Sequence, residues 1–193
     1  RELHPHVKRT WSFTYGHFDL IREFYFNSEK EYGIFCEDDI FIRKDFIHHL
    51  PKIIENFEGL NLDMLLLGYL TEYQLDENFP GLYQKGPSPS TENPFSYFAY
   101  PDSIWGAQMY MLTKKQAGIL INKYSPPYAD LSINNDTMTP FNSDWTITKE
   151  GNRALIYPMM AIEDGKTIYS DGGQQNYHQD CHKINYVEGL FYE

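Results

Sequence analysis

The sequence has few cysteines, few basic residues and no long apolar run. Its 193 residues contain only two cysteines, Cys36 and Cys181, so the disulfide framework of a small secreted domain is not expected. The longest apolar run, Met64 to Gly68, is far shorter than the roughly 20 residues of a membrane span, and no signal-peptide pattern opens the chain. We therefore expect a protein without a membrane span in a reducing, cytoplasmic setting, with the Cys36 thiol packed inside an apolar strand.

Acidic residues outnumber basic residues by 27 to 16, which gives a formal net charge of −11. No run of Lys or Arg is longer than a pair such as Lys8-Arg9. Because such a surface repels a phosphate backbone, we expect no nucleic-acid partner. Apolar residues make up 41% of the chain, enough for a folded core, and the length suits one domain over residues 1–193.

Helical and strand-like patterns alternate along the chain, which predicts an α/β fold. The predicted helices are His17 to Tyr32, broken by Gly33, then Asp45 to Phe57 with an interruption at Pro51, Lys114 to Lys123 capped by Thr113, and a short helix opened by Ser143 or Asp144 and ended by Gly151. The predicted strands are Ile34 to Cys36, Leu62 to Leu70, Trp105 to Leu112 and Ala154 to Tyr157. Loops are predicted over Thr71 to Pro94 and Ser125 to Asn142, and a polar, irregular tail from Pro158.

Three consecutive carboxylates, Glu37, Asp38 and Asp39, interrupt the otherwise apolar run GIFCEDDIFI. Adjacent anions at the end of a buried strand repel one another and lose hydration, so either a cation binds there or the chain turns sharply into water. Ligands of open α/β sheets bind beyond the carboxyl ends of strands, and hard divalent cations prefer oxygen ligands. A cation at this position could bridge the phosphates of a nucleotide diphosphate.

Several blocks of the sequence occur in the order found in a known family. They are TYGHFDLIREFYFNSEKEYGIFCEDDIFI, LLLGYL, SIWGAQMYMLTKKQAGIL and NSDWTITKEGNRALIYPMMAIEDG. In these blocks the chain resembles the family 25 glycosyltransferases, which include lipooligosaccharide and collagen galactosyltransferase relatives and similar proteins of large DNA viruses. The resemblance implies a GT-A-like open mixed sheet flanked by helices, a Mn²⁺ or Mg²⁺ ion, a UDP-linked sugar donor, a glycan or glycoprotein acceptor, and inversion at the anomeric carbon. A viral relative would act in the host cytoplasm.

One part of the family's fold has no matching block in this sequence. Its members have an N-terminal strand and helix that bind the base of the donor, whereas this chain begins at Arg1, close to the later helix. We therefore expect the nucleotide-binding part to be missing here or to have diverged.

The resemblance also implies roles for individual residues. Asp39, the last acid of the triplet, is the expected metal ligand, and Glu37 or Asp38 is expected to bond ribose or a water. His178 and His182 are candidates for a further metal ligand, because GT-A enzymes commonly take one from a C-terminal histidine. A zinc site formed by these histidines and Cys181 is the weaker reading, since the segment lacks a second ligand pair.

Two further blocks supply candidates for substrate binding and catalysis. Trp105, Gly106 and Gln108 lie in a block that is similar to the family's glycine-containing strand, where a sugar approaches the backbone, although a core tryptophan in a tight turn fits Trp105 equally well. Asp144 is the expected catalytic base, with Asp130 and Asp136 as rivals, and a helix N-cap is the alternative role for Asp144.

Three classes of function follow from these residues. The first is a metal-dependent inverting glycosyltransferase of the hexosyltransferase class. The second is a metal-dependent phosphohydrolase or nuclease, whose acids are usually spread over several strands. The third is a sugar-binding or structural module that keeps the fold without the chemistry.

Overall fold

The computed structural model describes residues 3–75, 79–165 and 171–192 and has the mixed α/β architecture predicted from the sequence. The strands are β1 (Tyr32–Cys36), β2 (Ile40–Ile42), β3 (Met64–Leu70), β4 (Tyr83–Gln84), β5 (Ser96–Ala99), β6 (Trp105–Thr113), β7 (Arg153–Tyr157) and β8 (Ala161–Glu163). The helices are α1 (Pro5–Asn27), α2 (Phe46–Gly59), α3 (Lys114–Lys123), α4 (Tyr128–Ser132), α5 (Ser143–Thr146) and α6 (Gly172–Asn185).

A six-stranded mixed sheet forms the centre of the molecule, in the order β1-β6-β3-β7-β5-β4. Strands β3 and β7 pair in parallel, and the other neighbours pair antiparallel. Strand β3 is buried along its whole length, as expected for a central strand covered on both faces.

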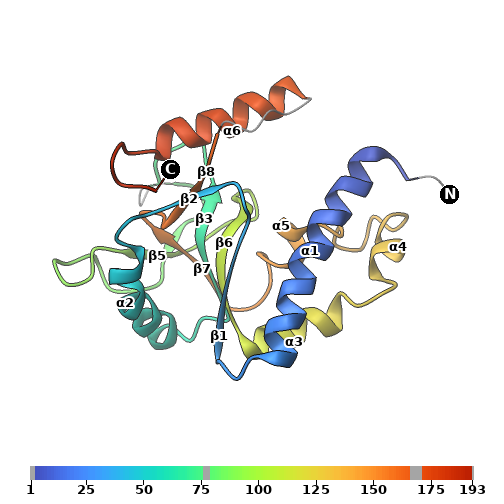
Figure 1. Ribbon diagram of the computed structural model, residues 1–193, viewed down its shortest axis with the longest axis horizontal. Coiled ribbons are helices and arrows are strands. Elements are labelled where there is room, and N and C mark those ends of the chain that lie inside the picture. The colour runs from blue at the N-terminus through green and yellow to red at the C-terminus, as the bar shows by residue number, and fades with distance from the viewer. Residues whose placement is uncertain (1–2, 76–78, 166–170, 193) are drawn as a thin grey trace.

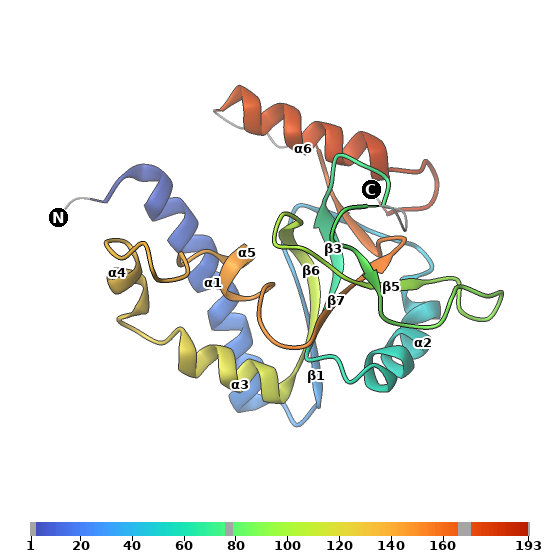
Figure 2. The same cartoon turned by 180° about the vertical axis from the view of Figure 1, so that it is seen from behind.

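Helices cover both faces of this sheet. Side chains alternate along a strand, so Met64 and Leu66 face one layer while Leu65 and Leu67 face the other. The first layer contains α1 and α3, and the second contains α2, which Figures 1 and 2 show on opposite sides of the sheet. The acidic triplet follows β1, an edge strand of this sheet that is anchored in the first layer by Phe35.

A second, two-stranded sheet joins β2 to β8 and lies across β3. A Cβ atom built on Gly68 would lie 2.8 Å from the carbonyl oxygen of Ala161, so only glycine allows β8 to approach β3 this closely. The approach is fixed by a hydrogen bond of 2.7 Å from the Met160 amide to the Leu67 carbonyl. This crossing places the end of β8 beside the end of β1.

The structure confirms most predicted elements and corrects several boundaries. The tail predicted to be irregular instead contains β8 and α6, and the second predicted loop contains α4. The first helix begins at Pro5, well before the predicted start, because proline suits the first turn of a helix. Residues 76–78 of the first predicted loop and 166–170 of the tail lie outside the described residues. Among the helices that the structure describes, none combines the length and apolarity needed to cross a bilayer.

Candidate functional site

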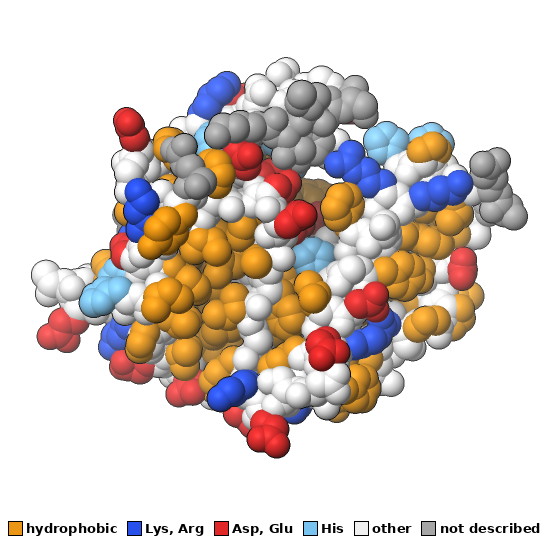
Figure 3. Space-filling view, in the orientation of Figure 1, with side chains coloured by type: hydrophobic (Ala, Val, Ile, Leu, Met, Phe, Trp, Pro, Cys, Tyr) orange, Lys and Arg blue, Asp and Glu red, His pale blue; other side chains and the backbone are white. Residues whose placement is uncertain are grey.

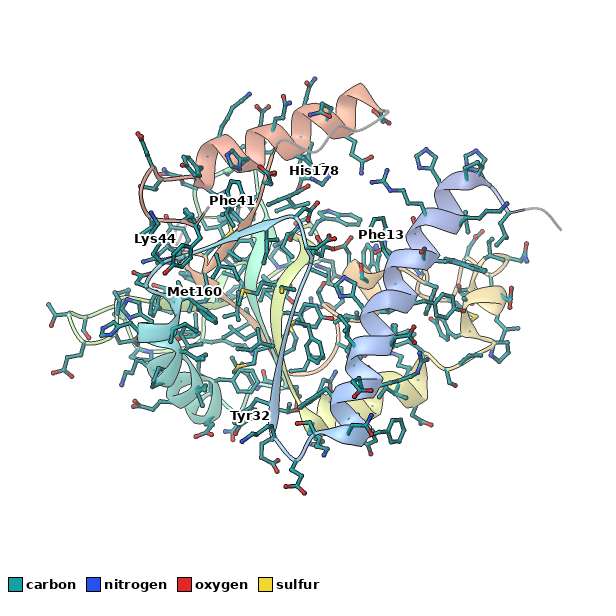
Figure 4. All side chains as sticks on the ribbon, viewed as in Figure 1. Phe13, Tyr32, Phe41, Lys44, Met160 and His178 are labelled. Carbon is teal, nitrogen blue, oxygen red and sulfur yellow. The ribbon has the colours of Figure 1, made fainter. Side chains whose placement is uncertain are left out.

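A cleft of about 530 Å³ lies between the carboxyl end of β1, the ends of α5 and α6, and the N-terminal half of α1 (Figure 4). The predicted residues that line it are Glu37, Asp38, Asp39, Asp144 and His178. Further lining residues are His6, Arg9, Thr10, Ser12, Phe13, Gly16, His17, Leu20, Cys36, Asn142, Ser143, Glu163 and Gln174. The structure thus brings together in one cleft five of the residues chosen from widely separated parts of the sequence.

The acidic triplet occupies the turn where the chain passes from the six-stranded to the two-stranded sheet. The Glu37 amide continues the β1–β6 ladder by donating to the Gln108 carbonyl at 2.9 Å. The Asp164 amide donates to the Asp39 carbonyl at 2.8 Å. Both ends of the triplet are therefore held by the backbone, while its carboxylates line the cleft.

Asp39 lies among other carboxylates that line this cleft. Burial raises the pKa of its carboxyl group, and the nearby carboxylates of Glu37 and Glu163 raise that pKa further. Such shifts mean that the surroundings of Asp39 oppose its negative charge. A bound cation would reverse this effect.

Asp144 lies at the start of α5 and does not cap that helix. The cap is Asn142, whose side-chain oxygen accepts a hydrogen bond from the Asp144 amide at 2.8 Å. The Asp144 carboxylate instead accepts a hydrogen bond of 2.7 Å from the Gly106 amide. Burial raises the pKa of Asp144, the hydrogen bond from Gly106 lowers it, and the Glu37 carboxylate raises it again. The capping role considered for Asp144 therefore belongs to Asn142.

The two candidate histidines of α6 occupy different surroundings. His178 lines the cleft, and its Nδ1 lies 2.5 Å from Oε2 of the buried Glu163. His182 is not among the described lining residues, and its Nδ1 lies 2.8 Å from the Glu163 carbonyl oxygen. The His182 ring also stacks on Tyr186 and meets Phe41 edge-on. These contacts give His178 access to the cleft and make His182 part of the packing beneath α6.

His17 is one of the cleft residues that were not among the predicted site residues. It is only 6% exposed, its Nδ1 shares a hydrogen bond of 3.0 Å with the Tyr110 hydroxyl, and its Nε2 lies 3.5 Å from Oε1 of Glu37. The tyrosine thereby fixes the imidazole, and the imidazole faces the first carboxylate of the triplet. A single histidine on an amphipathic helix carries no sequence signal for this role, because its partners lie on distant strands.

The residues predicted on β6 lie next to the cleft. None of them is among the described residues that line it. Gly106 has φ +105°, and a Cβ there would lie 2.0 Å from Oε1 of Gln108, so glycine is required at this position. Gln108 is buried, and its Oε1 accepts no hydrogen bond from the described residues. Trp105 packs edge-on against Trp145 and lines a second cavity of about 380 Å³.

The structure bears on two further expectations. Cys36 is exposed and lines the cleft, so the prediction of a packed thiol is wrong for Cys36, whereas Cys181 is buried. In the part of the chain that the structure describes, no group of three or more His, Cys, Asp or Glu side chains is arranged to hold a metal ion by itself.

No protein-family model matches this sequence, and no curated protein matches it significantly. The function is therefore argued from the chemistry of the cleft.

Proposed function

We propose that this protein is a divalent-metal-dependent inverting glycosyltransferase that moves a sugar from a nucleotide-sugar donor, UDP-linked, to a hydroxyl group of a glycan or glycoprotein acceptor. The observation that carries the proposal is the convergence of the acidic triplet, His178 and Asp144 on one cleft at the carboxyl end of β1. Open α/β sheets bind their ligands at this edge.

The donor set fits a hard cation that is shared with a substrate. Mg²⁺ and similar ions are usually held by one or two carboxylates, with substrate phosphates and waters completing the coordination shell. Asp39 would hold the ion, and His178 is the candidate for a second ligand. The hydrogen bond of His178 Nδ1 to Glu163 fits that role, because metal-bound histidines usually donate their other ring nitrogen to a carboxylate. When bound, the cation would balance the charge that builds on the diphosphate as the sugar leaves.

The residues of this chain would then carry out a single displacement. The acceptor oxygen forms a bond to the anomeric carbon while the bond from that carbon to the diphosphate breaks, and the bonding electrons leave with the nucleotide diphosphate. Asp144 takes the proton of the acceptor hydroxyl, for which its raised pKa suits it. His17 would orient the Glu37 carboxylate, and the exposed Asp38 would bond ribose or a water.

Asp39→Ala tests the metal assignment. We expect the wild-type protein to be stabilised by Mn²⁺ with UDP, by about 2.7 kcal/mol at 100 times Kd, which corresponds to a rise in Tm of roughly 5 to 10 °C for a chain of this size. Asp39→Ala should abolish this metal-dependent shift while the fold remains intact. The exposed Asp180, paired with Lys183 on α6, provides the control variant Asp180→Ala, which should keep the full shift.

A screen of nucleotide sugars for metal-dependent nucleotide release separates the three classes of function. Release that increases with a glycan acceptor supports the transferase. Equal release with and without any acceptor would indicate a phosphohydrolase, and a protein that binds sugars without release would be a binding module. A full Mn²⁺- and UDP-dependent shift in Asp39→Ala would remove Asp39 as the metal ligand.

A further inference from the structure

One face of α1 forms the wall of the cleft opposite the acidic triplet. The lining residues His6, Arg9, Phe13, Gly16 and Leu20 recur every three or four positions, a spacing that places them along one side of a helix. Figure 3 shows acidic side chains on one side of the hollow and basic and apolar side chains on the other. The cleft therefore has two chemically different walls.

Phe13 is the exposed aromatic ring of the α1 wall. Its side chain is 53% exposed, and Figure 4 places it on the side of α1 that faces the end of β1. The Arg9 guanidinium lies 5.5 Å from the centre of this ring. One turn further along, a Cβ built on Gly16 would meet no atom within 4 Å, so the α1 wall is also open to the cleft at Gly16. A flat, exposed apolar ring in a polar cleft is a platform on which the face of a sugar can stack.

The charge of the α1 wall is opposite to that of the protein as a whole. Of the described residues that line the cleft, Arg9 is the one Lys or Arg side chain. The formal net charge of the chain is −11. A guanidinium group binds carboxylates and phosphates through paired hydrogen bonds. Arg9 therefore favours a ligand with an anionic group next to the ring that stacks on Phe13.

The position of Asp144 indicates which substrate this wall faces. This step rests on the proposed function. In a single displacement the base must lie on the side of the acceptor, away from the leaving nucleotide. Asp144 belongs to α5, which packs against α1, whereas the metal candidates belong to the end of β1 and to α6. The α1 wall thus lies on the acceptor side of the cleft.

We propose that the α1 wall binds the acceptor, and that this acceptor is a sugar carrying an anionic group. The sugar ring stacks on Phe13, and its carboxylate or phosphate is bound by Arg9.

Binding of small sugars to the full chain, without metal or nucleotide, tests this assignment. The probes are glucuronate and glucose 6-phosphate, with glucose and inorganic phosphate as comparisons, measured by ligand-observed NMR titration. We expect both anionic sugars to bind more tightly than either comparison. Phe13→Ala should weaken their binding about tenfold, and Arg9→Gln should weaken it about tenfold or more while leaving glucose unchanged.

Matched variants on the same helix serve as controls. Phe26 is 68% exposed near the other end of α1, and Lys8 is an exposed cation outside the described lining of the cleft, so Phe26→Ala and Lys8→Gln should leave sugar binding unchanged. Asp39→Ala should also keep sugar binding, which separates this proposal from the metal assignment. The proposal is overturned if inorganic phosphate binds as tightly as glucose 6-phosphate, if Phe13→Ala has no effect, or if Arg9→Gln weakens Mn²⁺-dependent UDP binding in place of sugar binding.

Discussion

Asp144 lies at the start of a helix but has no capping role there. Asn142 caps α5, so the Asp144 carboxylate is not needed for the helix and is turned toward the Gly106 amide. Burial and the Glu37 carboxylate raise its pKa, which makes it a stronger proton acceptor than an ordinary aspartate. A carboxylate with a raised pKa in a cleft is a candidate general base.

We therefore expect Asp144→Asn to lower turnover roughly 100-fold or more, with UDP affinity preserved. The base must be ionised, so the wild-type rate should fall as the pH drops through the pKa of Asp144, which is raised above the ordinary aspartate value. The variant should lack this acidic limb. Turnover across the pH range, together with UDP titrations, measures both effects.

The rival carboxylates provide the matched controls for this experiment. Asp130→Asn and Asp136→Asn should keep both the rate and the acidic limb, since neither side chain lines the described cleft. If Asp144→Asn turns over at a near-normal rate, Asp144 is not the base.

Single site residues could be predicted where the local sequence places charged side chains within an apolar run. Three adjacent carboxylates in an apolar run indicate a site, because burial without a counter-charge is costly. His17 carries no such signal, and its partner Tyr110 lies 93 positions further along the chain. Its contact with Tyr110 depends on the packing of α1 against the sheet, which local sequence does not specify.

At the scale of elements, the position of α6 decides whether His178 reaches the cleft. Cys181 is its one buried residue among those described, so few apolar contacts hold it in place. His182 supplies a hydrogen bond to the Glu163 carbonyl and ring contacts to Phe41 and Tyr186. His178, one turn earlier, then reaches the cleft because His182 docks the helix.

A matched pair of substitutions separates docking from metal binding. In His178→Gln the new amide can still donate to Glu163 but offers no imidazole to a metal, so we expect an almost unchanged Tm without ligand and a reduced shift with Mn²⁺ and UDP. In His182→Gln the ring contacts are lost, so we expect a loss of about 1–2 kcal/mol in the free energy of unfolding with the metal-dependent shift retained. Thermal melts of both variants, with and without Mn²⁺ and UDP, measure these effects. The reverse pattern would make His182 the ligand.

Elements with strong apolar periodicity or clear end signals were predicted correctly, whereas α4, α6 and the short strands β2, β4, β5 and β8 were missed. The α3 helix follows its predicted N-cap, because the Thr113 hydroxyl accepts a hydrogen bond from the Gln116 amide. The α6 sequence GGQQNYHQDCHKIN is polar on nearly every side, and its helical start depends on Asp171, whose carboxylate accepts bonds from the Gly173 and Gln174 amides. The β5 strand has only four residues, too few for an alternating pattern to show.

At the scale of the whole molecule, the cleft lies where the turn between the two sheets meets α1, α5 and α6. The close crossing at Gly68 brings Glu163 beside the triplet, and the packing of α1 and α5 brings in His17 and Asp144. The fold class follows from alternating patterns in the sequence, whereas this convergence depends on tertiary packing. The convergence also has a consequence for stability, since it gathers like charges within one partly enclosed space.

The protein should accordingly become more stable when one of these charges is removed. The pKa of Asp39 is raised in the folded state, so the folded chain binds its proton more tightly than the unfolded chain does. Stability is therefore lost as the pH rises from the unfolded value near 3.8 through the raised folded pKa, and it stays lower above both. We expect Asp39→Asn to raise Tm at pH 7, by about 2–4 °C for each kcal/mol gained in the free energy of unfolding. The difference in Tm between the variant and the wild type should vanish below the unfolded pKa, because both side chains are then neutral. Thermal melts between acidic and neutral pH measure this difference.

The control Asp180→Asn, in an exposed pair with Lys183, should show no such gain. An Asp39→Asn variant that is less stable than wild type at pH 7 would contradict this prediction. It would mean that favourable contacts stabilise the Asp39 carboxylate and that its charge does not destabilise the fold.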